Sequence, residues 1–110
     1  MKFLVLWTID LGLLSQPMVR SIARMPDYGR DLERRGKVLA RYHVVGAHGG
    51  AWIYEVDSHE EFENLLAVAP VFNFAHYDVR PLADMSGTPD VVGTDVVGTD
   101  VVGAGAGDVG

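Results

Sequence analysis

The chain contains no cysteine among its 110 residues. It therefore has no disulfide framework, no thiolate nucleophile and no cysteine-ligated zinc or iron–sulfur site. No apolar run approaches the ~20 residues that a membrane-spanning helix needs. The apolar start from Phe3 to Trp7 is interrupted by Thr8 and Asp10, and no small-residue cleavage site follows. Because this pattern does not match a secretory signal, we expect a cytoplasmic protein.

Positive charge is also scarce. Nine Lys and Arg stand against fifteen Asp and Glu, which gives a formal net charge of −6. All the basic residues precede residue 81, and residues 88–110 carry acidic charge only. A nucleic-acid-binding domain needs a basic surface to displace counterions, so this class of protein is excluded.

The chain changes character near residue 86. Residues 1–86 alternate apolar runs with amphipathic stretches and have the length of one domain. Residues 87–110 repeat a five-residue unit, Val-Val-Gly-Thr-Asp, whose period fits neither a strand nor a helix. We interpret residues 87–110 as an acidic Gly/Val low-complexity tail. Alternatively, its Val-Val pairs favour an extended peptide that would dock on the sheet edge of a protein partner.

Hydrophobic periodicity predicts four strands and two helices in the first 86 residues. Ser15 offers an N-cap and Gly36 a C-cap for the first helix, whereas Pro26 inside it should bend or split it. The order β-α-β-β-α-β predicts a ferredoxin-like α+β fold, an antiparallel four-stranded sheet with two helices on one face. The strands are expected over residues 2–9, 38–46, 51–57 and 72–80, and the helices over 16–35 and from the Ser58 capping box to Pro70.

Two helices cover only one face of such a sheet, so the other face needs a different cover. A domain of ~85 residues with no disulfide and one bare apolar sheet face is marginal alone. We therefore predict at least a homodimer, in which two copies pack sheet to sheet and close a dimeric α+β barrel around a cavity. The large side chains expected on that bare face are Trp7, Val45, Trp52, Val56 and Phe74.

Alternation along the strands divides the side chains into two sets. A symmetric hairpin loop over residues 47–50 would pair His43 with Tyr54 and Arg41 with Val56. The smaller, apolar set is predicted to pack under the helices and comprises Ala40, Tyr42, Val44, Ala51, Ile53, Ala75, Tyr77 and Val79. The other set mixes aromatic and ionisable groups, as ligand cavities do, and comprises Arg41, His43, Val45, Trp52, Tyr54, Val56, His76, Asp78 and Arg80.

On this assignment His43, Tyr54, His76 and Asp78 gather in one cavity as candidate catalytic residues. Imidazole has an unperturbed pKa of ~6.5 and suits proton transfer near neutral pH. The Asp78 carboxylate would fix a histidine tautomer, and Asp27 would reach the cavity mouth from a bent helix. The candidate substrate-binding residues are Trp7, Arg41, Trp52 and Phe74.

Two other interpretations of these polar side chains stay open. Each could be a solvated residue on the surface or on an edge strand. The second interpretation is a zinc or iron site built from His43, His48 and His76, since imidazole binds both metals. No His-x-x-x-His spacing supports that metal site, so we expect neither a metal nor another cofactor.

Three segments resemble the muconolactone isomerase family of small dimeric α+β barrel proteins. They are Gly36 to Val56, the Ser58-His59-Glu60-Glu61 capping box, and Leu65 to Phe72. A glycine at Gly46 before the hairpin loop is shared, and Ala69-Pro70-Val71-Phe72 matches a Leu-Pro-Leu-Phe segment of that family. The resemblance covers residues 2–82. It implies an enzyme that moves a proton between carbons of an unsaturated lactone, without cofactor or metal, and that assembles into dimers and larger rings.

The chemistry of that family is attributed to Lys and Glu side chains on the first helix. Here the equivalent stretch reads Ala23-Arg24-Met25-Pro26-Asp27, which contains no Lys and leaves Asp27 as the one carboxylate. We predict a cofactor-independent isomerase or cyclase acting next to a carbonyl of a small lactone-like substrate. His43, His76 or Asp27 would be the base, and Tyr54 or Arg41 would stabilise the enolate oxygen.

Two other functional classes remain. One is a non-catalytic ligand-binding or assembly module whose tail recruits a protein partner. The other is a cofactor-free monooxygenase in which Trp7, Trp52 and Tyr54 shelter an oxygen-reactive substrate anion.

Overall fold

The structure, a computed structural model, describes residues 1–85. The predicted tail at residues 87–110 and its docking role lie outside the described residues. None of the helices in the described part is long and apolar enough to cross a membrane. The elements are β1 (Lys2–Ile9), η1 (Leu11–Leu13), α1 (Gln16–Arg34), β2 (Val38–His43), β3 (Gly49–Glu55), α2 (His59–Ala67), η2 (Phe72–Phe74) and β4 (Ala75–Leu82).

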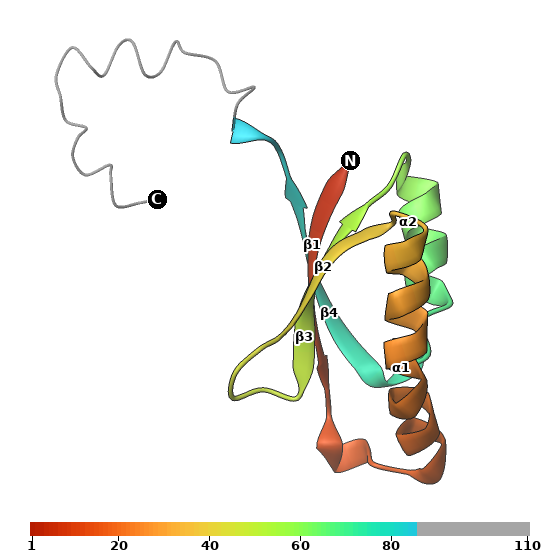
Figure 1. The fold of residues 1–110 in the computed structure, drawn as a ribbon. Helices are drawn as coiled ribbons and strands as arrows, with labels where there is room; N and C mark the ends of the chain where they lie inside the picture. Colours follow the sequence, from red (N-terminus) through yellow and green to blue (C-terminus); the bar gives the residue numbers. More distant parts are fainter. Residues whose placement is uncertain (86–110) are drawn as a thin grey trace, which may run out of the picture.

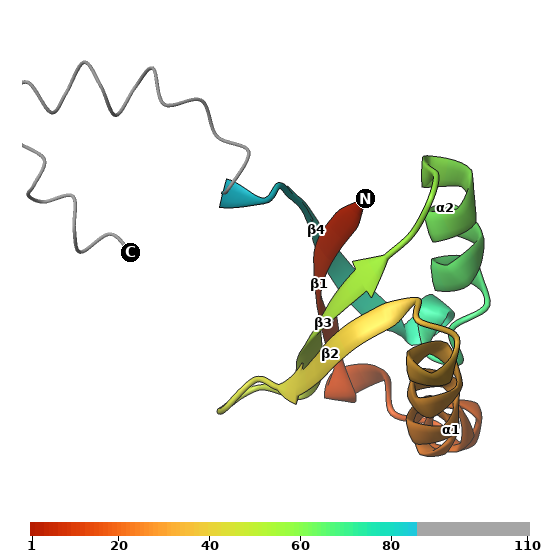
Figure 2. The same ribbon diagram turned by 45° about the horizontal axis from the view of Figure 1, so that its top comes forward.

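The four strands form one antiparallel sheet in the order β2-β3-β1-β4. Both helices lie on the same side of that sheet (Figure 1), and the opposite side carries no helix in the turned view either (Figure 2). The predicted ferredoxin-like α+β fold is therefore confirmed for a single chain.

The ends of α1 follow the predicted caps. Ser15 Oγ accepts a hydrogen bond from the Met18 N–H at 3.3 Å. At the other end Gly36 has φ +75°, a left-handed conformation that favours glycine. The Lys37 N–H then donates to the Leu32 carbonyl at 2.9 Å and the Gly36 N–H to the Glu33 carbonyl, which together form a Schellman motif.

Pro26 does not split α1, which runs as one helix from Gln16 to Arg34. Proline removes one helical hydrogen bond. Packing of the buried face, which includes Met18, Met25 and Leu32, holds the helix on the sheet on both sides of the proline. Tertiary packing thus outweighs the local preference of the sequence.

The side of the sheet under the helices carries the large side chains, not the small ones, so the predicted assignment of the hairpin strands is wrong. Phe3 pairs with Tyr54 and Val5 with Trp52, and all four are buried at 6% exposure or less. Helix and sheet must be packed without voids, and only bulky side chains fill the space between them. Val45, expected beside them, is 99% exposed in the hairpin turn.

The predicted register of the hairpin is also wrong, because each residue pairs four positions away from its predicted partner. His43 pairs with Gly50, and Arg41 pairs with Trp52. The connection is longer than expected, and it contains Gly46 at φ +85°. A shift by an even number of residues keeps each side chain on the same side of the sheet, so Arg41 and His43 still share a face with Trp52.

Strand β4 presents the predicted faces, but its polar side chains lie on the other side of the sheet from Arg41 and His43. Tyr77 pairs with Trp7 and therefore lies on the helix side, whereas His76 pairs with Thr8 and Asp78 with Leu6 on the bare side. Other apolar side chains of that bare face, which we call the open face, are half-buried or exposed: Leu4, Leu6, Ala40, Tyr42, Ala51 and Ile53.

Candidate active site

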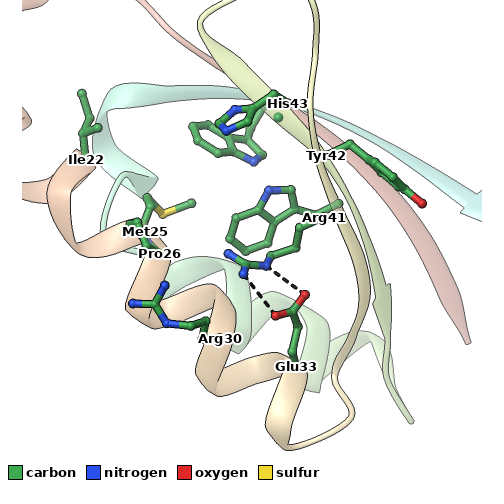
Figure 3. A pocket seen from close by; sticks show the side chains of 11 residues that line it. Ile22, Met25, Pro26, Arg30, Glu33, Arg41, Tyr42 and His43 are labelled. Atoms are coloured by element: carbon green, nitrogen blue, oxygen red, sulfur yellow. Dashed lines mark hydrogen bonds and ion pairs between the residues drawn. The ribbon is translucent and has the colours of Figure 1, made fainter.

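A cavity of about 440 Å³ lies between α1 and the helix side of β1, β2 and β3 (Figure 3). Its volume suits a small ligand. In Figure 3, Ile22, Met25 and Pro26 of α1 lie across the cavity from Arg41 and His43 of β2. The lining residues are Trp7, Ile22, Met25, Pro26, Arg30, Glu33, Arg41, Tyr42, His43, Gly50 and Trp52.

Arg41 is the most firmly held charged group in this cavity. Its Nε lies 3.0 Å from Glu33 Oε2, and its Nη2 donates to Glu33 Oε1 at 3.1 Å, as the dashed lines in Figure 3 show. The guanidinium carbon also lies 5.3 Å from the Trp52 ring centroid, within the range of a cation–π contact. A planar cation is thus fixed against one wall of the cavity.

Gly29 of α1 makes this position of Arg41 possible. A Cβ atom at Gly29 would lie 2.3 Å from Arg41 Nη1 and 2.8 Å from the Trp52 ring, and neither distance is sterically allowed. Gly29 was not among the residues predicted from the sequence. The available signal was its place on the buried stripe of α1, four residues after Met25 and three before Leu32, where glycine indicates a close approach.

Two indole rings form the inner wall. Trp7 and Trp52 meet edge to face, with centroids 6.0 Å apart and planes at 82°. Trp52 is 5% exposed, and the Trp7 Nε1 is buried without a hydrogen-bond partner. His43 is exposed and lies at the lip of the cavity, where its ring is open to solvent and to a bound ligand.

Tyr54 lies in the core and does not line the cavity. It is 3% exposed, and its hydroxyl is 3.1 Å from the Tyr28 hydroxyl. Tyr28 donates its single proton to the Leu65 carbonyl at 2.6 Å, so Tyr54 is the donor to Tyr28. Burial raises the pKa of Tyr54 and of Tyr28 above the ordinary phenol value, which keeps both hydroxyls protonated.

The predicted convergence of His43, Tyr54, His76 and Asp78 on one face is wrong. His76 and Asp78 lie on the open face, on the far side of the sheet from the cavity. The Asp78 carboxylate pairs with Arg80 at 3.0 Å, which lowers the pKa of Asp78 below its ordinary value.

The other two candidates outside the cavity are Asp27 and Phe74. The Asp27 side chain is 82% exposed on α1 and forms an ion pair with Arg30, because the unbroken helix does not push it inward. Phe74 is half-buried in η2, against the core. The structure therefore brings Trp7, Arg41, His43 and Trp52 together and leaves the remaining candidates elsewhere.

The alternative metal site is not assembled within residues 1–85. No three side chains of the types that bind metals lie close enough to share an ion there. His43 and His76 are separated by the sheet itself, since they belong to opposite faces.

The fold and the cavity define a class: small α+β proteins with a cavity between the first helix and a four-stranded sheet. The family model described as muconolactone delta-isomerase matches residues 1–86. The chain therefore belongs to the muconolactone delta-isomerase family. This membership favours an isomerase over the binding-module and monooxygenase alternatives.

Two curated relatives are similar in sequence. The muconolactone delta-isomerase of Cupriavidus pinatubonensis is 38% identical over 61 residues, which cover 56% of this chain and 66% of that protein. The muconolactone delta-isomerase of Rhodococcus opacus is 31% identical over 68 residues, which cover 60% and 73%. The chain thus spans just under two thirds of the first relative.

Two solved structures share the fold. A crystal structure of muconolactone isomerase superposes with a TM-score of 0.70 at 19% identity, over 80% of this chain and 94% of that one. A 5-chloro-2-hydroxyhydroquinone dehydrochlorinase from Burkholderia phenoliruptrix, in complex with 2,5-dihydroxybenzoquinone, superposes with a TM-score of 0.61 at 21% identity, over 76% and 94%.

Proposed function

We propose that this chain is a cofactor-independent isomerase that moves a proton next to the carbonyl group of a small lactone-like substrate. The observation that carries the proposal is the cavity beneath α1. In a chain of this family, it places one imidazole, a fixed guanidinium and two indole rings around a single space.

The reaction needs a group that takes a proton from one carbon and returns it to another. When the base removes the proton, the electron pair of the C–H bond moves toward the carbonyl oxygen and gives an enolate. The double bonds then shift, the proton is delivered to a second carbon, and the oxygen recovers its neutral carbonyl form. No electrons or atoms are gained or lost, so the chemistry requires no cofactor.

His43 is the proposed base. Among the described residues it is the one imidazole that lines the cavity, and no hydrogen bond within this region occupies its ring. A positioned imidazole contributes ~10²–10⁴-fold to proton transfer. Arg41 is the proposed anchor for the oxygen atoms of the substrate. Ile22 and Met25 supply the apolar wall that excludes water from the enolate.

The test is turnover of a panel of unsaturated lactones, with muconolactone included, in D₂O. Proton NMR follows both isomer formation and deuterium entry at the exchanging carbon. We expect H43A to lower kcat by ~10²–10⁴-fold. The matched control is H48Q, because His48 is an exposed histidine in the hairpin outside the cavity and its change should leave turnover unaltered.

Two further variants compare this cavity with the open face. H76A and D27A change the other candidate bases, and both should retain turnover because these side chains lie outside the cavity. Wild-type turnover in H43A combined with a large loss in H76A or D27A would contradict the assignment of the base.

We also propose that a second copy of the chain covers the open face. Support comes from the half-buried Leu4, Leu6 and Ile53 and from Tyr42, which is 63% exposed, all on a sheet face that carries no helix. Such an apolar face is a poor surface for a free domain of this size. Sedimentation equilibrium should give a dimer or larger assembly that L6D dissociates. A monomeric wild-type chain at micromolar concentration would refute this proposal.

A further inference from the structure

Three contacts surround the Arg41 guanidinium, and they restrain it in different ways. Its carbon lies over the Trp52 ring at 5.3 Å, an attraction that depends little on the direction of the N–H groups. Gly29 lets Nη1 lie against α1, because a Cβ atom there would overlap with it. Glu33 makes a directional contact: Arg41 Nη2 donates to its Oε1 at 3.1 Å, and Nε lies 3.0 Å from its Oε2.

The contact with Glu33 occupies one edge of the guanidinium and leaves another edge free. Nε and Nη2 form the side edge, whereas Nη1 and Nη2 form an end edge with two parallel N–H groups. In Figure 3 this end of Arg41 points away from Glu33, across the cavity toward the part of α1 that carries Pro26 and Arg30. The Arg41 side chain is 25% exposed and lines the cavity, so its end edge is available to a bound ligand.

We propose that Glu33 is a positioning residue that fixes the rotation of Arg41 and thereby aims the end edge at the oxygen atoms of the substrate. This inference rests on the proposed isomerase function, in which Arg41 is the anchor, and Glu33 acts on the substrate through Arg41. Without Glu33 the guanidinium would be free to turn, and each binding event would have to order it again. Ordering one long side chain weakens binding by ~2–10-fold.

The backbone position of Glu33 suits this role. It follows Gly29 by four residues, about one helical turn, so both lie on the side of α1 that meets Arg41. Leu32, the preceding residue, is fully buried and holds this end of the helix on the sheet. The Glu33 side chain itself is 39% exposed, so its substitution should leave the fold intact.

The negative charge of Glu33, taken alone, would act in the opposite direction. Its carboxylate lies at the cavity wall, where it repels an anionic ligand. Removing that charge with Arg41 still in place would therefore strengthen the binding of an anion. Loss of positioning predicts weaker binding, so the sign of the change distinguishes the two effects.

The first test measures the Kd of benzoate, a planar probe whose two oxygen atoms share one negative charge. We expect E33Q to raise this Kd by ~2–10-fold. The matched control is D31N, because Asp31 is a carboxylate of the same helix that pairs with Arg34 and Arg35 outside the cavity, and its change should leave the Kd unaltered. In the R41K background, which has no planar edge to position, E33Q should lower the Kd instead. An unchanged or lower Kd in E33Q alone, or no benzoate binding by the wild type, would overturn the proposal.

The second test observes the Arg41 side chain without any ligand. Nη1 and Nη2 exchange places when the guanidinium turns about its Cζ–Nε bond, and ¹⁵N NMR of the side chain detects this exchange. We expect two separate Nη signals for Arg41 in the wild type and in D31N, and one averaged signal in E33Q. The R41K variant, which lacks these signals, identifies them. An averaged signal in the wild type, or separate signals that persist in E33Q, would contradict the positioning role.

Turnover separates this inference from the proposed function. With an active lactone, E33Q should raise KM by ~2–10-fold and leave kcat nearly unchanged, because Glu33 orients the anchor and does not handle the moving proton. Weaker benzoate binding and an averaged Arg41 signal in E33Q, without turnover of any lactone by the wild type, support the positioning role in a site whose proposed reaction is wrong. Lactone turnover with the same KM in wild type and E33Q overturns the role of Glu33 and leaves the isomerase.

Discussion

Substituting Gly29 by alanine tests whether α1 approaches the sheet as closely as the cavity requires. The new Cβ would lie 2.3 Å from Arg41 Nη1, 2.9 Å from Arg41 Cδ and 2.8 Å from Trp52 Cη2. Trp52 is buried at 5% exposure and cannot give way. The Arg41 side chain must therefore leave its place over the indole ring and beside Glu33.

The magnitude follows from two opposing terms. Overpacking in a closely packed site costs about 1–3 kcal/mol. Alanine in a helix interior is favoured over glycine by about 1 kcal/mol, which offsets part of that cost. We expect G29A to lower the free energy of unfolding by about 1 kcal/mol. In a domain of this size that corresponds to a fall in Tm of roughly 4–8 °C.

Denaturation of four proteins measures the effect: wild type, G29A, R41A and the double variant. In the R41A background two of the three close contacts vanish, so the same glycine-to-alanine change should cost less or become stabilising. Turnover should follow, because displacing Arg41 removes the proposed anchor and raises KM. If the glycine-to-alanine change stabilises the protein by about 1 kcal/mol in both backgrounds and leaves KM unchanged, α1 does not approach the sheet as closely as described.

Two smaller predictions concern residues away from the cavity. Y54F removes the hydroxyl that donates to Tyr28 in the core. It should lower the free energy of unfolding, measured by urea denaturation, by about 0.5–1.5 kcal/mol and leave kcat unchanged. A large loss of kcat with intact stability would place the Tyr54 hydroxyl in the reaction. For Glu61, the Lys37 ammonium and the Asp57 N–H lower its pKa from the ordinary 4.5. Its contribution to stability is therefore present above the unfolded-state pKa and is lost as the pH falls through the lower folded-state pKa. E61Q should flatten the decline in Tm as the pH falls below about pH 5. If Tm falls with pH in E61Q as it does in the wild type, ionised Glu61 does not stabilise the fold.

The order and kind of the elements were predictable because each one has a local signal. The Ser15 and Ser58 caps and the Gly36 terminus all form the predicted hydrogen bonds or backbone conformation. The strand from Lys2 to Ile9 is apolar on both faces, since it lies in the middle of the sheet.

The placement of His76 and Asp78 on the opposite face from Arg41 and His43 was not predictable from the hairpin. Strand β4 pairs with β1, so its register depends on contacts between residues far apart in the chain, such as Trp7 and Tyr77. Alternation groups His76 with Asp78 within the strand but does not say which face the pair joins. Side-chain volume indicates which face of the hairpin meets the helices, because Trp52 and Tyr54 are too large for an exposed face and fill the space under the helices.

Part of the candidate site was predictable because several of its residues are neighbours in one hairpin. Arg41, His43 and Trp52 belong to one hairpin, so their shared face survives the error in register. Trp7 joins them through the pairing of β1 with β3. Glu33 and Gly29 come from α1, and only the packing of that helix against the sheet shows that they meet Arg41.

Two histidines on opposite sides of the sheet report directly on which side a substrate binds. ¹³C-edited NMR of imidazole signals during titration with a lactone follows His43 at the cavity and His76 on the open face in one experiment. We expect the His43 ring signals to shift while those of His76 stay in place. Shifts at His76 with His43 unchanged would contradict this expectation.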